Sequence, residues 1–189
     1  MNHVVFRGAE RVAAGSSLDA ALAAQRLAAE PSDAGVLIFD DQGRQVDFDL
    51  SGGPEDLTAR LAPAADVVAP RGRGRPKLGV TPREVTLLPR HWDWLASQPG
   101  GASVALRKLV EAARRESEGP DRIRRSREAA YRFATVMAGD REGFEAAMRA
   151  LFAGDDAAFE ERIQAWPADI AAQLRSFAAE AFGADTAAV

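Results

Sequence analysis

The fold of the middle of this chain is decided by residues 83–110, which read REVTLLPRHWDWLASQPGGASVALRKLV. Residues 84–88 alternate between apolar and polar as a short strand does, and Pro89 then begins a helix. Residues 99–102 break that helix, and Ser103 is placed to cap a second one. A lone strand followed by two short helices cannot bury its own apolar faces. The pattern therefore predicts a symmetric dimer whose strands pair into a two-stranded ribbon.

This order of elements resembles the ribbon-helix-helix superfamily of bacterial repressors and antitoxins, in which such a ribbon enters the DNA major groove. The resemblance implies that the start of the second helix, with Gly101 at the turn, clamps a phosphate, because exposed N–H groups at a helix N-terminus attract anions. It also implies a dimer core formed by apolar residues of the strand and of both helices. The expected dimer-core residues are Val85, Leu87, Trp94, Leu95, Leu106 and Val110.

The outward face of the predicted strand departs from that resemblance. If Val85 and Leu87 point inward, then Glu84, Thr86 and Leu88 face the groove, where the superfamily usually has basic or amide side chains. The Thr86 hydroxyl can bond base edges, whereas a Glu84 carboxylate is repelled by phosphates. The outward face of the strand thus counts against DNA binding, and against sequence-specific readout in particular.

A basic region extends to both sides of this pattern. Residues 71–132 carry 15 lysines and arginines against 7 acidic residues, a net charge of +8, whereas the rest of the chain carries 9 against 21, a net charge of −12. Such a polarised charge indicates a module that binds a polyanion, and a solvated linker running into charged helix faces is the alternative. Arg73-Gly74-Arg75-Pro76 is similar to the core of an AT-hook, an extended arm that lies in the minor groove of A·T-rich DNA. The predicted nucleic-acid-binding residues are Arg71, Arg73, Arg75, Lys77, Arg83, Thr86, Ser103 and Arg107.

The flanking regions complete an α+β fold class. Residues 1–62 are expected to form a small α/β domain of order ββαββα, with a β-hairpin over 36–50 and a helix capped by Ser16 or Ser17. Residues 63–82 form a basic Pro/Gly/Arg linker that contains the AT-hook-like stretch 71–77, and residues 83–118 form the ribbon-helix-helix-like segment. Residues 119–189 read as a helical C-terminal region with a helical hairpin capped by Asp140 and Asp155, and with Tyr131 in its core.

Composition limits the other functions of this chain of 189 residues. It has no cysteine, which excludes thiolate metal sites and cysteine nucleophiles, and no cofactor is expected. Its two histidines are far apart, and no catalytic motif is present, so we do not expect an enzyme. The aspartates around residues 40–49 are interpreted as turn formers and a solvated strand face rather than as metal ligands. No apolar run approaches the ~20 residues of a membrane span, and we expect a cytoplasmic location without membrane contact.

Two functions remain open on the sequence. The first is a homodimeric DNA-binding protein, either a transcriptional regulator or a DNA-organising factor. The second is a protein-interaction module, antitoxin-like or an adaptor, in which the ribbon-helix-helix segment serves dimerisation and the acidic C-terminal helices bind a protein partner. Over most of its length the chain also resembles the uncharacterised bacterial family called domain of unknown function 2239, through motifs such as Val36–Asp40, Arg73–Lys77 and Val85–Leu95. That resemblance implies no activity.

Overall fold

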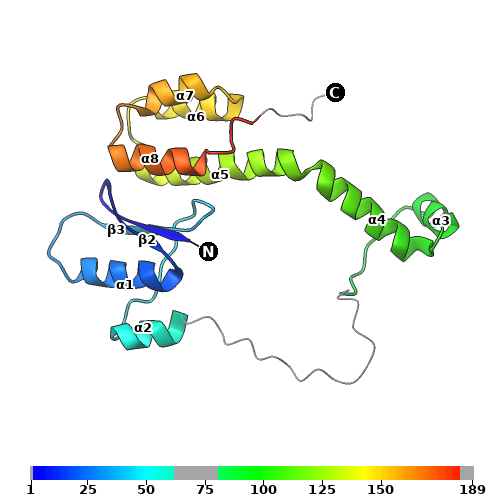
Figure 1. The fold of residues 1–189 in the computed structure, drawn as a ribbon, viewed down its shortest axis with the longest axis horizontal. Helices are drawn as coiled ribbons and strands as arrows, with labels where there is room; N and C mark the ends of the chain where they lie inside the picture. Colours follow the sequence, from blue (N-terminus) through cyan, green and yellow to red (C-terminus); the bar gives the residue numbers. More distant parts are fainter. Residues whose placement is uncertain (1, 62–80, 184–189) are drawn as a thin grey trace. The chain divides into compact units, whose positions relative to one another are not determined.

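The computed structural model describes residues 2–61 and 81–183 (Figure 1). Those residues form an α+β structure with a three-stranded sheet near the N-terminus and eight helices. The strands are β1 (His3–Arg7), β2 (Glu10–Gly15) and β3 (Val36–Phe39), and the helices are α1 (Ser17–Ala28), α2 (Pro54–Leu61), α3 (Pro89–Ser97), α4 (Gly101–Glu116), α5 (Glu118–Ala138), α6 (Phe144–Ala153), α7 (Asp156–Ile163) and α8 (Ala168–Phe177).

The sheet is antiparallel, has the strand order β2-β1-β3, and is buried on both faces. Side chains alternate along a strand, so Phe6 and Phe39 point to one face while Val5 and Ile38 point to the other. The Val5 face packs against α1, which presents buried alanines such as Ala20 and Ala24. The opposite face packs against the C-terminal helices.

An aromatic cluster joins the sheet to these helices. The Phe133 ring of α5 lies 5.5 Å from the Phe6 ring and 4.9 Å from the Phe39 ring, measured between centroids. On its other side Phe133 lies 5.3 Å from the ring of Phe177 in α8. Phe133, Phe6 and Phe39 are fully buried, so the sheet and the C-terminal helices share one hydrophobic core.

The chain accordingly divides into two units that differ from the domains expected along the sequence. Residues 1–63 and 119–189 cluster as one compact unit, and residues 64–118 as another. We call the described part of the first, residues 2–61 and 119–183, the composite domain, and the described part of the second, residues 81–118, the central segment. The sequence separated 1–62 from 119–189, but the sheet needs the C-terminal helices to cover its Phe6 face.

The predicted 36–50 hairpin is wrong in its second half. Val36–Phe39 is a strand, but it pairs with β1, and beyond the turn only an isolated bridge joins Phe39 to Gln45. The alternating Val46, Phe48 and Leu50 pack against the α1 side of the core without forming a ladder. Their period of two therefore reflects burial alone, and the order of the N-terminal elements is ββαβα.

At two helix starts, the residue predicted to cap the helix does so in the structure. Ser16 caps α1 as predicted, with a capping box in which its hydroxyl accepts from the Asp19 N–H and the Asp19 carboxylate accepts from the Ser16 N–H. The Ser16 hydroxyl and backbone N–H, which both donate to the Asp19 carboxylate, hold the pKa of Asp19 below its ordinary value. Asp155 caps α7 by accepting from the Ala158 N–H at 3.0 Å.

Two predictions for the C-terminal helical region, the Asp140 cap and the burial of Tyr131, are wrong. Asp140 caps no helix, because α6 begins after Gly143, whose φ of 83° lets the chain turn sharply. Tyr131 was predicted in the core but is 42% exposed and lies edge-on to Phe152, at 5.7 Å between ring centroids. Its neighbours Phe133 and Met137 are buried as expected.

None of the helices in the described residues combines the length and apolarity needed to cross a bilayer.

Candidate nucleic-acid and dimer interface

The central segment consists of an extended stretch followed by the two helices α3 and α4. Leu88 is extended, with φ −67° and ψ 149°, and Pro89 occupies the first turn of α3 as predicted. After α3 ends, Gly100 takes a φ of 87°, which reverses the chain into α4. Its conformation explains why a glycine stands at this position, since a side chain would be strained there.

The two helices α3 and α4 bury one leucine and one alanine. Leu95 of α3 is 2% exposed and Ala105 of α4 is 8% exposed, and these are the buried residues of the central segment. Leu95 was expected in the dimer core, whereas Ala105 was missed. Alanine at a close contact between helices gives no hydrophobic stripe that sequence reasoning could have detected.

The remaining large apolar side chains of the central segment are open to solvent. Trp94 is 50% exposed and Val110 is 64% exposed, and Leu106 is half-buried. The exposed apolar surface, as we call it, consists of Val85, Leu88, Trp92, Trp94, Leu109 and Val110. It holds six of the nine large hydrophobic side chains that are exposed among the described residues, which concentrates exposed apolar area in the central segment.

Residues 84–88, predicted as a strand, form no strand in this single chain. Val85 is 56% exposed and Leu87 is half-buried, so the side of the stretch that was predicted to face inward is only partly covered within the central segment. A ribbon strand in a symmetric dimer pairs only with its copy on the other chain, so the strand stays a prediction about the dimer.

Ser103 does not cap the second helix, which corrects the sequence prediction. The N-cap is Gly100, three residues before Ser103, and it provides no side-chain hydrogen bond to the helix that begins at Gly101. Ser103 is exposed in the first turn, and its carbonyl accepts from Nε of Arg107 at 3.2 Å. The N-cap residue thus leaves the N–H groups that open α4 without a side-chain acceptor.

The predicted nucleic-acid-binding residues that the structure describes all lie on the surface of the central segment. Arg83, Thr86, Ser103 and Arg107 are all exposed. Arg83 and Thr86 lie in the extended stretch and Ser103 and Arg107 on the first two turns of α4, so the central segment carries all four. The remaining candidates, Arg71, Arg73, Arg75 and Lys77, and with them the AT-hook-like stretch, lie outside the described residues.

The acidic C-terminal helices mostly use their aromatic residues for internal packing. Phe159 and Trp166 are buried, and Phe144 packs against the core of the composite domain. The Trp166 indole donates to the Glu142 carbonyl at 3.1 Å. Phe152 is the exception, at 49% exposed. One exposed aromatic beside Tyr131 is a small apolar surface for a protein partner.

The aspartates of residues 40–49 organise turns. The buried Asp40 carboxylate accepts from the backbone N–H groups of Gln42 and Arg44, at 2.9 and 3.0 Å, and from Nε of Arg44 at 2.9 Å. Burial by itself would raise the pKa of Asp40, but these hydrogen bonds and the Arg44 charge outweigh it, and the pKa lies below its ordinary value. The Ser51 hydroxyl and N–H likewise lower the pKa of Asp49. Within the described ranges, no three acidic or histidine residues group as metal ligands would.

The chain is thus an α+β protein that joins a compact composite domain to a helical central segment with an exposed apolar surface. It belongs to the family whose model is described as "Uncharacterized protein conserved in bacteria (DUF2239)", which matches residues 2–178. No curated protein and no solved structure shows a significant match to the chain.

Proposed function

We propose that the protein is a homodimeric DNA-binding protein, a transcriptional regulator or a DNA-organising factor. In this proposal two central segments pair through the exposed apolar surface and through a ribbon formed by residues 84–88 of both chains. The ribbon and the basic residues 71–77 then contact DNA, the ribbon in the major groove and the arm in the minor groove.

The observation that carries the proposal is the combination of charge and exposed apolar area in one part of the chain. The exposed apolar surface of α3, α4 and the preceding stretch is the kind of surface that a dimer covers. Residues 71–118 carry 10 lysines and arginines against 5 acidic residues, and this net charge of +5 would attract phosphates. Arg83, Thr86, Ser103 and Arg107, all exposed, would contact bases or phosphates beside the dimer seam.

A second candidate function keeps the dimer and replaces DNA by a protein partner. The exposed Tyr131–Phe152 pair of the composite domain favours it, because it offers a partner an aromatic contact next to acidic helices. That pair is much smaller than the exposed apolar surface, and we rank this function second.

The proposal is tested by binding of the full chain to a fluorescent A·T-rich duplex and to a random duplex at several salt concentrations. We expect binding that weakens steeply with salt, because each neutralised phosphate contributes about 0.9 to the slope of log K against log salt. The double variant Arg73→Ala, Arg75→Ala should lower that slope by about two and reduce the preference for A·T-rich DNA.

A matched control removes the same charge elsewhere. Arg149 and Arg162 are exposed residues of α6 and α7, and the double variant Arg149→Ala, Arg162→Ala should leave the slope unchanged. Equal slopes for the two double variants would contradict the role of the arm. No binding of the wild-type chain at low salt would contradict DNA binding altogether and favour the protein-interaction function.

A further inference from the structure

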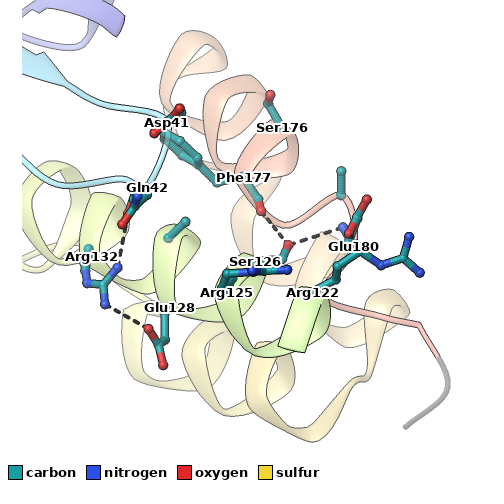
Figure 2. A pocket seen from close by; sticks show the side chains of 12 residues that line it. Asp41, Gln42, Arg122, Arg125, Ser126, Glu128, Arg132, Ser176, Phe177 and Glu180 are labelled. Atoms are coloured by element: carbon teal, nitrogen blue, oxygen red, sulfur yellow. Dashed lines mark hydrogen bonds and ion pairs between the residues drawn. The ribbon is translucent and has the colours of Figure 1, made fainter. Parts of the chain in front are cut away.

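A polar cleft opens in the composite domain between the turn after β3, one face of α5 and the end of α8 (Figure 2). Its volume is about 580 Å³, within the range of about 300–1,000 Å³ that small-molecule sites occupy. Three arginines of α5 line it, together with residues of the turn and of α8. None of these residues belongs to the proposed DNA interface.

The walls of the cleft are held in place by contacts between elements far apart in the sequence. The Ser126 hydroxyl of α5 donates to the Phe177 carbonyl at 2.6 Å and accepts from the Glu180 N–H at 3.2 Å. On the other wall, Arg132 donates to the Gln42 carbonyl at 3.3 Å. Gly43, with a φ of 68°, lies so close to α5 that a Cβ there would clash with the Ala129 carbonyl. The cleft is therefore preformed.

The three arginines of the cleft differ in their partners. Arg132 forms an ion pair with Glu128 at 2.9 Å. Arg122 lies 3.6 Å from Glu180, longer than the 2.7–2.9 Å typical of a charge-assisted hydrogen bond, and both side chains are more than half exposed. Arg125 forms no ion pair with any carboxylate of the described residues. Its guanidinium is thus the cation of this cleft that is available to a ligand.

A hydrogen bond to the backbone accounts for a neighbouring arginine but not for Arg125. Nε of Arg127 donates to the Ala181 carbonyl, in the turn that follows α8, at 2.9 Å. Arg125 makes no comparable bond to a carbonyl among the described residues.

Two further residues define what a ligand would need besides an anionic group. Asp41 is exposed at the turn and forms no ion pair within the described part of the chain, so its carboxylate can accept from a hydroxyl or amino group. Phe177 is half-buried against Phe133 and borders the cleft, which gives a flat ring a surface to rest on. Figure 2 shows Asp41 and Phe177 across the cleft from Arg122 and Arg125.

We propose that this cleft binds a small phosphorylated ring compound, of which a nucleoside monophosphate is the simplest example. The phosphate pairs with Arg125 and draws Arg122 away from its long contact with Glu180. The Asp41 carboxylate accepts hydrogen bonds from hydroxyl or amino groups on the rest of the ligand, and the ligand's ring packs on Phe177. The proposal does not depend on DNA binding.

The experiment is a titration of the full-length, isotope-labelled protein with AMP, followed residue by residue in ¹H–¹⁵N NMR spectra. We expect saturable shifts of the amides of Ser126, Ala129 and Phe177, with a dissociation constant on the order of 1 mM or below. Adenosine, which lacks the phosphate, should bind at least about tenfold more weakly.

The variants separate this cleft from general attraction of an anion to a basic protein. Arg125→Ala should weaken AMP binding by about tenfold or more, and Asp41→Asn by a smaller factor. The matched control is Arg124→Ala, which removes the adjacent charge, one paired with Asp121 outside the cleft. Equal affinities of the Arg125→Ala and Arg124→Ala variants would overturn the proposal. So would AMP-induced shifts that are absent from the cleft or confined to residues 81–118.

Discussion

The composite domain and the central segment bury their apolar residues to very different extents. The composite domain encloses aromatic side chains such as Phe6, Phe133 and Phe159 completely, from elements more than a hundred residues apart in the chain. The central segment buries Leu95 and Ala105 and leaves Trp92, Trp94 and four aliphatic residues exposed. Burying a large apolar side chain stabilises the folded state by about 1.5–3 kcal/mol. Within one chain, most of this stabilisation therefore falls to the composite domain. This contrast supports our proposal that a second copy of the chain covers the exposed apolar surface of the central segment.

The largest effect is expected for Phe133→Ala. This ring is fully buried and contacts three other phenylalanine rings, so its removal should destabilise the composite domain by about 3–5 kcal/mol. Chemical denaturation followed by circular dichroism measures the change. Tyr131→Ala, two residues away but 42% exposed, serves as the control and should cost about 1 kcal/mol or less. Similar losses for the two variants would break the claim that sheet and C-terminal helices share one core.

A next-largest effect is expected for Leu87→Asp in the central segment. In the proposed ribbon this change buries an unpaired charge, which should weaken the dimer by about 3 kcal/mol or more. Sedimentation equilibrium should then show a monomer, while the denaturation of the composite domain stays as in the wild type.

The matched control for that variant is Thr86→Asp, which places the same charge on the opposite side of the stretch. It should remain dimeric and lose DNA affinity, because the proposed ribbon turns Thr86 toward the groove. A dimeric Leu87→Asp variant with a monomeric Thr86→Asp variant would mean that the two sides of the strand are reversed.

A smaller effect, dependent on pH, is expected for Asp40→Asn. The hydrogen bonds and Arg44 that lower the pKa of Asp40 favour its ionised form in the folded state. The unfolded chain then takes up a proton at higher pH than the folded one, so this stabilisation is present above the ordinary pKa of 3.8 and is lost as the pH falls through the lower folded value.

Replacing the carboxylate should therefore cost about 1–2 kcal/mol at pH 7, and the cost should shrink toward pH 2. Thermal melts of wild type and variant between pH 7 and pH 2 measure it. Asp47→Asn, at an exposed neighbour, is the control and should leave the stability at pH 7 nearly unchanged. A constant difference across this pH range would contradict the assigned role of the Asp40 carboxylate.

Local signals in the sequence predicted individual elements well. Ser16, one of the two serines expected to cap α1, Pro89 at the start of α3 and the Asp155 cap each act within a single turn, and the structure has all three. The predictions were wrong where contacts between residues far apart in the sequence determine the structure. Val46, Phe48 and Leu50 alternate because they cover α1, and no short-range pattern distinguishes that from a hairpin strand.

The joining of both ends of the chain into the composite domain was equally hidden. Val36–Phe39 is apolar at every position, which fits burial on both faces of the sheet. This pattern does not reveal that α5 and α8 are the helices that pack on one of those faces. The two helices of the candidate interface were predicted, but the start of α4 was placed too late. Ser103 is a favourable cap by type, yet the positive φ of Gly100 begins the helix earlier.

Hydrogen exchange of the amides of residues 84–88 in the full-length wild-type protein tests whether these residues pair across a dimer. In the proposed dimer, alternate amides of this stretch are protected by pairing with a second chain, and this protection increases with protein concentration. Exchange at the rate of an unprotected peptide across the micromolar range would contradict it, because the central segment would then lack the partner that its exposed apolar surface requires.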